Sequence, residues 1–206
     1  MSLIDDLAAD RLLAIIRGTS VDAAIAAAIT LVDEGVRSME ISLSSTDALT
    51  VLSEVSSALG DRVRLGAGTV LTPADVDAAL GNGASYIVTP AIAPSVATAV
   101  DRGVPVLCGA LTPTEVVTAL DAGADAVKLF PVSSMGPRYV KDLRAPFPST
   151  PFVPVGGVGA EQAEQFLADG AIAVGVASPL LGDAANGGDL DALRERARRF
   201  LNAVRR

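Results

Sequence analysis

Short apolar runs recur along the chain, and each is followed by a longer segment whose apolar residues have helical spacing. This alternation is typical of repeated strand–helix units around a parallel sheet. Eight such units in one chain predict a closed (β/α)₈ barrel, the TIM-barrel architecture. The predicted strands are Leu12–Ile16, Ser38–Ser42, Val63–Ala67, Ser85–Thr89, Val104–Cys108, Ala126–Phe130, Phe152–Val155 and Ile172–Val176.

The segments between these runs are rich in alanine, and several begin with Ser, Thr or Pro, as helices commonly do. Glycines follow them at the position where a left-handed residue often ends a helix. The predicted helices include Val21–Glu34, Pro73–Gly81, Ala93–Arg102, Thr112–Ala122 and Ala160–Ala168, and the terminating glycines are Gly35, Gly83, Gly103, Gly123 and Gly170.

Three segments lie outside this repeat. Leu3–Arg11 is expected to form an extra helix that covers the bottom of the barrel, and Leu190–Val204 the last helix. Asp183–Asp189 contains Asn-Gly-Gly and is interpreted as a surface loop. No linker divides the chain, so residues 1–206 are predicted to form a single α/β domain, a TIM barrel with an N-terminal capping helix. An open doubly wound sheet is the alternative, but it rarely needs eight consecutive units.

Composition narrows the functional classes. Half of the residues are apolar, and the net charge of −8 has the wrong sign for binding nucleic acid. No apolar run approaches the ~18 residues that span a bilayer. Cys108 is the only cysteine, and the first residues lack a secretory signal, so a cytoplasmic location is expected.

The inventory of chemically active side chains is also restricted. There is no histidine, which excludes Ser-His and Cys-His nucleophile pairs and imidazole metal sites. Sixteen basic residues include only two lysines, Lys128 and Lys141. A lysine within an apolar strand therefore needs a specific explanation.

Lys128 lies in the run Ala126-Val127-Lys128-Leu129-Phe130. The period-two alternation of a strand directs Val127 and Leu129 towards the outer helices and Lys128 into the barrel. The alternative is a lysine that extends to water or pairs with a carboxylate. Apolar surroundings remove hydration from the ammonium and favour the neutral amine, which attacks ketones.

Glu40 is predicted to share the interior with Lys128, because Met39 and Ile41 alternate outward. One interpretation is a buried salt bridge that only joins two strands. The other is a general acid/base, for which no histidine is available here.

Small-residue turns follow the last two predicted strands. Gly156 and Gly157 follow the seventh, and Ser178 opens a short helix after the eighth. This is the usual phosphate position in barrels, where backbone N–H groups approach the anion closely. A Gly-Gly pair alone is often only a tight turn.

Other polar residues follow strand ends. Arg17 and Thr69 are candidates to bind a substrate carboxylate, although Arg17 suits a rim salt bridge equally well. Met135, Arg138 and Tyr139 lie in a predicted long loop after the sixth strand and are expected to shape the entrance to the site. The alternative is that these loop residues are only solvated.

Six motifs together resemble the 2-keto-3-deoxy-6-phosphogluconate and 2-keto-3-deoxy-6-phosphogalactonate aldolases, in order and over nearly the whole chain. They are Ala14-Ile15-Ile16-Arg17-Gly18, Glu40-Ile41-Ser42-Leu43, Gly66-Ala67-Gly68-Thr69-Val70-Leu71, Ile87-Val88-Thr89-Pro90, Val127-Lys128-Leu129-Phe130-Pro131 and Pro154-Val155-Gly156-Gly157-Val158.

The resemblance implies a class I aldolase, usually a homotrimer, that needs no metal or other cofactor. Lys128 would form an imine with C2 of the keto acid and Glu40 would move protons, giving pyruvate and glyceraldehyde 3-phosphate. The implied contacts to the carboxylate and ketone are Arg17, Thr69, Pro90 and Phe130, and the implied phosphate contacts are Gly156, Gly157 and Ser178.

One departure bears on the substrate. Many gluconate-type relatives have arginine four residues after the catalytic glutamate, where this chain has Ser44, and threonine where it has Val155. Both differences favour the galactonate branch. Two rival interpretations remain outside this chemistry: another phosphate-binding barrel enzyme of the isomerase or epimerase type, and a non-catalytic barrel that binds a phosphorylated sugar acid. Within it, a metal-dependent pyruvate aldolase is the competitor, but the sequence offers no second inward acidic residue beside Glu40.

Overall fold

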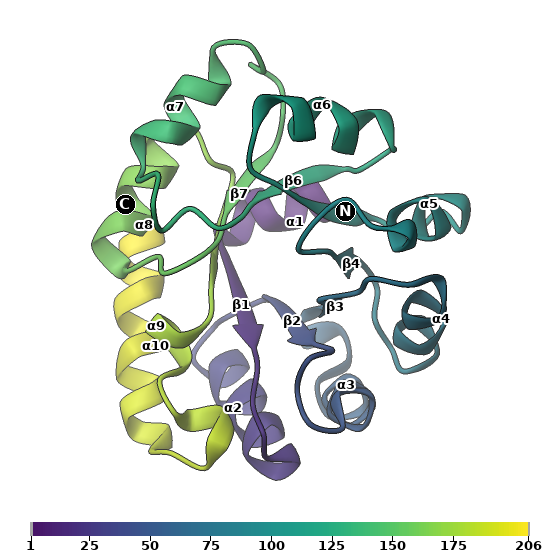
Figure 1. Ribbon diagram of the computed structural model, residues 1–206. Coiled ribbons are helices and arrows are strands. Elements are labelled where there is room, and N and C mark those ends of the chain that lie inside the picture. Colours follow the sequence, from purple (N-terminus) through teal and green to yellow (C-terminus); the bar gives the residue numbers. More distant parts are fainter. Residues whose placement is uncertain (1, 206) are drawn as a thin grey trace.

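The computed structural model describes residues 2–205, so the two terminal residues of the predicted 1–206 domain lie outside the described part. Within that range eight parallel strands form one sheet, in the order β7-β6-β5-β4-β3-β2-β1-β8 (Figure 1). The strands are β1 (Leu12–Ile16), β2 (Ser38–Ser42), β3 (Arg64–Gly68), β4 (Ile87–Val88), β5 (Val106–Ala110), β6 (Ala126–Leu129), β7 (Phe152–Pro154) and β8 (Val174–Val176).

The sheet closes on itself into a barrel. The first strand pairs with the last, with Leu13 opposite Gly175, and a parallel bridge between Val155 and Gly175 joins β7 to β8. Gly175 permits this approach, because a Cβ there would lie only 2.6 Å from the Val155 side chain. The (β/α)₈ prediction is confirmed, and the open doubly wound alternative is wrong because an open sheet has no such closing contact.

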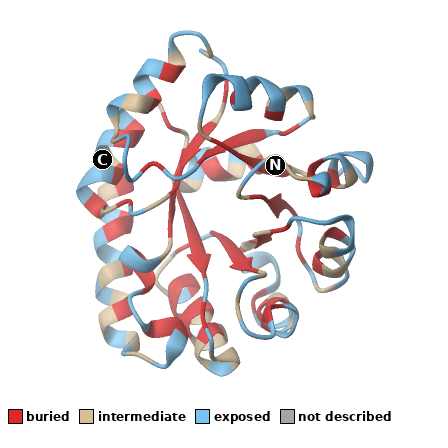
Figure 2. Ribbon diagram, in the orientation of Figure 1, coloured by how far each residue is buried: buried red, intermediate tan, exposed pale blue. Residues whose placement is uncertain are grey.

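Helices surround the barrel and turn their apolar faces towards it (Figure 2). The first helix begins with a capping box at Ser2 and Asp5. The helices are α1 (Leu3–Asp10), α2 (Val21–Asp33), α3 (Ala48–Leu59), α4 (Pro73–Gly81), α5 (Pro94–Asp101), α6 (Pro113–Asp121), α7 (Arg138–Arg144), α8 (Ala160–Ala168), α9 (Ser178–Leu181) and α10 (Leu190–Val204), with 3₁₀ turns η1 (Gly60–Arg62) and η2 (Ala184–Asn186).

The core has two layers. The outer layer lies between strands and helices and contains Met39, Val127 and Leu129, as their alternation predicts. The inner layer fills the barrel, and Leu3 and Leu7 of α1 belong to it. The prediction that the first helix covers one end of the barrel is therefore confirmed.

The predicted elements agree with the observed ones within a few residues. The fifth strand begins at Val106 rather than Val104, because Pro105 has no N–H to donate to the ladder. The predicted glycine helix ends all have positive φ; Gly35, for example, has φ 107°.

Two assignments were wrong. Asp183–Asp189 is not simply a surface loop, since it contains η2, whose Ala184 and Ala185 are each 1% exposed. The two apolar methyl groups are buried at α2, which outweighs the turn signal of Asn-Gly-Gly. Arg138 and Tyr139 were assigned to a loop but begin α7.

Candidate active site

Lys128 points into the barrel from β6. Its residue is 5% exposed, and it pairs in register with Gly109 of β5 and Val153 of β7. The Nζ atom lies 5.5 Å from the centre of the Phe130 ring, within reach of a cation–π interaction. The geometry of the strand therefore places a primary amine in largely apolar surroundings, as its alternation predicts.

Glu40 of β2 faces this amine. Its Oε1 atom lies 3.6 Å from Lys128 Nζ, and the residue is 1% exposed. The other oxygen, Oε2, is buried and has no hydrogen-bond partner among the residues that the structure describes. A buried acceptor without a partner is costly, so this oxygen is suited to a proton or a hydroxyl that arrives with a ligand.

Two glycines of β3 make room for the interior side chains. A Cβ on Gly68 would overlap the Glu40 carboxylate, and a Cβ on Gly66 would overlap the Tyr86 ring. Tyr86 is completely buried and donates a 2.7 Å hydrogen bond to the Met39 carbonyl, next to Glu40. Burial, and then the nearby Glu40 carboxylate, hold the pKa of Tyr86 well above its usual range, so the phenol stays neutral.

Arg17 and Thr69 meet at a third residue, Ser42. The Ser42 hydroxyl lies 3.4 Å from Arg17 Nε, 2.9 Å from Thr69 Oγ1 and 2.8 Å from Ser44 Oγ. Ser42 itself is completely buried. The ends of β1, β2 and β3 therefore contribute one connected cluster of hydrogen-bonding groups.

Thr69 has a backbone conformation that is unusual for its side chain. Its φ is 60°, in the left-handed region, where a β-branched residue is a genuine outlier. Such conformations cost on the order of 1–3 kcal/mol and concentrate at functional sites. The Ser42 hydrogen bond is one contact that holds the Thr69 hydroxyl in this position.

The loop that carries Arg17 is fastened to distant segments. Ser45 accepts a hydrogen bond from the Gly18 amide, and Asn186 of η2 accepts one from the Thr19 amide. A Cβ on Gly18 would overlap the Ala185 carbonyl, so glycine allows η2 to pack directly on this loop. The misassigned η2 segment thus supports the site.

The glycine turn after β7 and the start of α9 lie side by side. Gly156 and Gly157 have φ values of 118° and 70°, which exposes their backbone in a conformation that favours glycine. Ser178 begins α9 immediately after the eighth strand. These three residues line the same cavity, and a glycine turn beside a helix start suits an anion.

The ends of β1, β3, β4, β6, β7 and β8 border one cavity of about 510 Å³, within the ~300–1,000 Å³ typical of ligand sites. Eight of the nine predicted site residues line it, and Glu40 reaches it through Lys128. Those eight are Arg17, Thr69, Pro90, Lys128, Phe130, Gly156, Gly157 and Ser178. Their roles remain predictions.

Sequence reasoning missed several parts of the site. Ser42 had no assigned role, although it shares the inward face of β2 with Glu40. Ile15 also lines the cavity and could have been found from the same alternation. Of the three residues expected to shape the entrance, Tyr139 is instead held by a hydrogen bond to the Leu111 carbonyl; Met135 and Arg138 are exposed and do not line the cavity.

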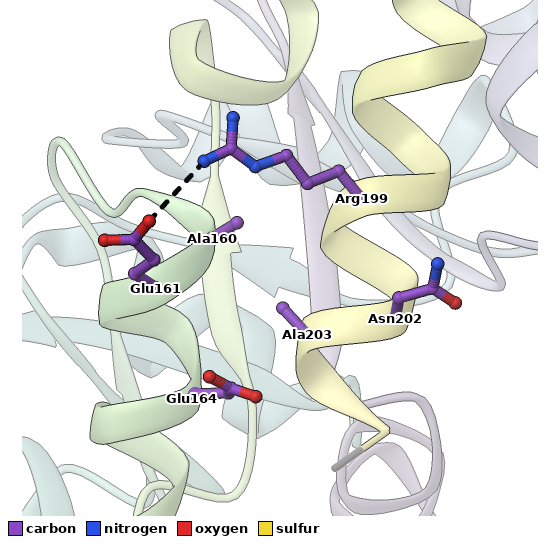
Figure 3. Close-up of a pocket in the computed structure, with 6 residues that line it drawn as sticks. All are labelled: Ala160, Glu161, Glu164, Arg199, Asn202 and Ala203. Atoms are coloured by element: carbon purple, nitrogen blue, oxygen red, sulfur yellow. Dashed lines mark ion pairs between the residues drawn. The ribbon is translucent and has the colours of Figure 1, made fainter.

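A second hollow, of about 400 Å³, lies on the outside of the barrel between α8 and α10 (Figure 3). Glu161 and Arg199 form a 3.9 Å ion pair across it, and both side chains are largely exposed. The six residues that line it provide neither a buried amine nor a buried carboxylate. This hollow therefore lacks the pair of buried groups that Lys128 and Glu40 form inside the barrel.

Between residues 2 and 205, no group of three or more Cys, Asp or Glu side chains is placed to hold a metal ion. No helix in that range is long and apolar enough to cross a membrane.

The chain matches known proteins over most of its length. The family model for KDPG and KHG aldolases covers residues 3–195. A 2-dehydro-3-deoxy-6-phosphogalactonate aldolase from Escherichia coli (strain K12) is 39% identical over 94% of both chains. A 2-dehydro-3-deoxy-phosphogluconate aldolase from Treponema pallidum (strain Nichols) is 30% identical over 82% of this chain and 80% of its own.

A solved structure described as native KDPGal has the same fold, with a TM-score of 0.88 and 38% identity over 94% of both chains. The family resemblance and the carbon–carbon lyase class expected from the motifs are therefore confirmed. Because the family model spans nearly the whole barrel and every strand that contributes to the cavity, this chain belongs to the KDPG and KHG aldolase family.

Proposed function

We propose that the protein is a class I aldolase that cleaves 2-dehydro-3-deoxy-6-phosphogalactonate into pyruvate and D-glyceraldehyde 3-phosphate through an imine on Lys128. One observation carries the proposal: a buried lysine amine lies 3.6 Å from a buried glutamate at the floor of a cavity. An amine and a carboxylate are the two groups that imine-based carbon–carbon cleavage requires.

The proposed reaction begins when Nζ of Lys128 attacks the C2 ketone. The resulting carbinolamine loses water with help from Glu40 and becomes a protonated imine. Glu40 then accepts the proton of the C4 hydroxyl, the C3–C4 bond breaks, and its electron pair moves into the imine. The aldehyde leaves, the remaining enamine is protonated at C3, and water hydrolyses the imine to pyruvate. The Oε2 atom, which has no protein partner in the described structure, is suited to these proton transfers.

The two charged ends of the substrate suit two different groups of residues that line the cavity. A guanidinium and a hydroxyl from Arg17 and Thr69 match the planar carboxylate next to the ketone. The turn at Gly156 and Gly157, together with Ser178, matches the terminal phosphate. Pro90 and Phe130 line the space between these ends and exclude water from the imine.

The galactonate epimer is favoured for two reasons. Ser44 stands where many gluconate-type enzymes have arginine, so Arg17 is left as the carboxylate anchor. The Escherichia coli relative named for the galactonate is 39% identical over 94% of this chain, whereas a Pseudomonas aeruginosa relative named for the gluconate is 37% identical over 65% of it. Activity on the gluconate epimer as well remains part of the proposal.

Trapping with borohydride tests the imine. Wild-type protein incubated with pyruvate and borohydride should gain one reduced adduct, which peptide mass spectrometry should locate on Lys128. Lys141 is the only other lysine and is exposed, so Lys141→Arg serves as a matched control and should be labelled like wild type. Lys128→Arg should not be labelled. Folded wild type without an adduct on Lys128 would contradict the proposal.

The same experiment separates the rival functions. An isomerase or epimerase that acts without an imine would give no adduct. A non-catalytic binding barrel would release no pyruvate from either phosphorylated epimer, and Lys128→Ala would preserve its ligand binding. By family resemblance we further expect a homotrimer, and the single reduced cysteine is in keeping with a cytoplasmic enzyme.

A further inference from the structure

The structure assigns Ser42 as the positioning residue that orients both carboxylate-binding groups, Arg17 and Thr69, and directs the Thr69 proton into the cavity. This inference rests on the proposed function, because it concerns the carboxylate end of the keto acid. Ser42 acts through these two neighbours, with which it shares hydrogen bonds.

The Ser42 hydroxyl can form only a limited number of hydrogen bonds. Ser42 Oγ carries one proton and two lone pairs. The N–H at Arg17 Nε uses one lone pair at 3.4 Å, which leaves one donor and one acceptor for two hydroxyl partners. Ser44 and Thr69, at 2.8 and 2.9 Å, must therefore be bonded in opposite senses, one donating and one accepting.

The direction of this hydroxyl chain depends on the surroundings of its two ends. Thr69 lines the cavity, whereas Ser44 is exposed on the rim and has water as a further partner. A carboxylate only accepts hydrogen bonds. A chain in which Ser44 donates to Ser42 and Ser42 donates to Thr69 leaves the Thr69 proton for the ligand. The opposite direction would turn the Thr69 proton away from it.

Ser42 also orients Arg17. Its bond to Ser42 uses Nε, the nitrogen nearest the side-chain stem, and leaves both terminal nitrogens for the two carboxylate oxygens. A flexible arginine that is already oriented loses less rotamer freedom when it binds. Ser42 therefore acts on both anchors at once, from the centre of a cluster that joins β1, β2 and β3.

This arrangement predicts a selective effect. The Ser42 cluster stands at the ends of the first three strands, whereas the proposed phosphate turn follows β7. Removal of the Ser42 hydroxyl should therefore weaken recognition of the carboxylate without a comparable effect on imine formation itself. The preference of the site for pyruvate over its uncharged methyl ester reports this recognition directly.

The test measures the concentrations of pyruvate and of methyl pyruvate that give half-maximal borohydride labelling. For Ser42→Ala the value for pyruvate should rise about tenfold, and that for methyl pyruvate less than about twofold, because only pyruvate offers a charged acceptor. Ser38→Ala is the matched control: Ser38 lies on the same strand, is also completely buried, and bonds to Asp10 at the opposite end of the barrel. The preference of Ser38→Ala for pyruvate over methyl pyruvate should equal that of wild type.

Further variants keep the result decisive. Ser42→Cys fills a similar volume with a weak donor and should reproduce the loss if Ser42→Ala does not fold. Ser44→Ala should reduce the preference for pyruvate over methyl pyruvate less than Ser42→Ala does, because it removes only the hydroxyl that donates to Ser42. An equal or larger reduction would overturn the assigned direction of the hydroxyl chain.

A parallel rise for both ligands, or an unchanged preference in Ser42→Ala, would overturn the positioning role. Failure of wild type to form any adduct would instead contradict the proposed function.

Discussion

Lys128 and Glu40 are close but not hydrogen-bonded: their nearest atoms, Nζ and Oε1, are 3.6 Å apart, beyond the usual range for an N–H···O bond. The pair comes from β6 and β2, which are not neighbours in the sheet. A purely structural salt bridge in such a dry place would gain from direct hydrogen bonds. This spacing, together with the unpartnered Glu40 Oε2, is better suited to groups that act on one shared substrate.

Replacing Glu40 with glutamine should slow the steps that need a proton transfer while leaving the Lys128 amine in place. The amide of Glu40→Gln would keep the shape of the side chain but could not accept a proton, so we expect kcat for cleavage to fall by about 10²–10⁴. Pyruvate should still be trapped on Lys128, because the amine is intact, but more slowly than in wild type, because Glu40 also assists the loss of water from the carbinolamine. The measurements are steady-state cleavage and borohydride labelling.

Glu161→Gln provides the control for this prediction, because Glu161 forms only an exposed ion pair on the barrel exterior and such pairs contribute little. Its activity should equal that of wild type. An active Glu40→Gln enzyme would assign the proton transfers to another group.

Gly68→Ala should misplace the glutamate without removing it. The added methyl group would overlap the Glu40 carboxylate, which must then move. Displacement of a catalytic group by about 1 Å can cost about 100-fold, so we expect a loss in kcat of that order. A crystal structure of the variant should show the carboxylate shifted from Lys128. Unchanged kcat with an unshifted carboxylate would refute the argument.

Gly157→Ala should affect the phosphate end alone. Its φ of 70° is accessible to alanine at a cost of about 1–2 kcal/mol, and the nearest atom to the new methyl group would be 3.6 Å away. The methyl group would occupy space next to the turn, so KM for the phosphorylated substrate should rise about tenfold, equivalent to about 1.4 kcal/mol. Half-maximal labelling by pyruvate, which has no phosphate, should occur at the wild-type concentration. If this concentration rose in parallel with KM, the substitution would have perturbed the whole site and not the phosphate end.

Asp10→Asn should change the pH dependence of stability. Burial raises the pKa of the Asp10 carboxyl above its ordinary 3.8. The hydrogen bond that this carboxyl accepts from the Ser38 hydroxyl opposes the shift but is the smaller effect. A carboxyl with a raised folded pKa contributes stability below its unfolded pKa and loses it as the pH rises through the folded value. Urea unfolding should therefore show that the free energy of unfolding of the variant increases relative to that of wild type as the pH rises from about 3 to about 7. A constant difference across that range would contradict the assigned direction.

Much of this protein follows from its sequence. The alternation of apolar runs and helical segments predicts the barrel, and the period of two along a strand places Lys128 and Glu40 in its interior. Both are local properties, since a side chain's direction depends on the backbone of its own strand. Parallel strands also bring their carboxyl ends to one face, so the shared location of Arg17, Thr69 and Gly157 is predictable as well.

Only the tertiary structure decided which of the inward residues meet. The Ser42 cluster depends on the register of three strands and on the left-handed conformation of Thr69, neither of which has a signature in local hydrophobic pattern. The burial of Ala185 against Gly18 likewise depends on the whole C-terminal segment packing beside α2. Local periodicity fixes the direction in which a side chain points. Its distance from a residue on another strand is set by barrel closure and by the glycines that let side chains approach one another.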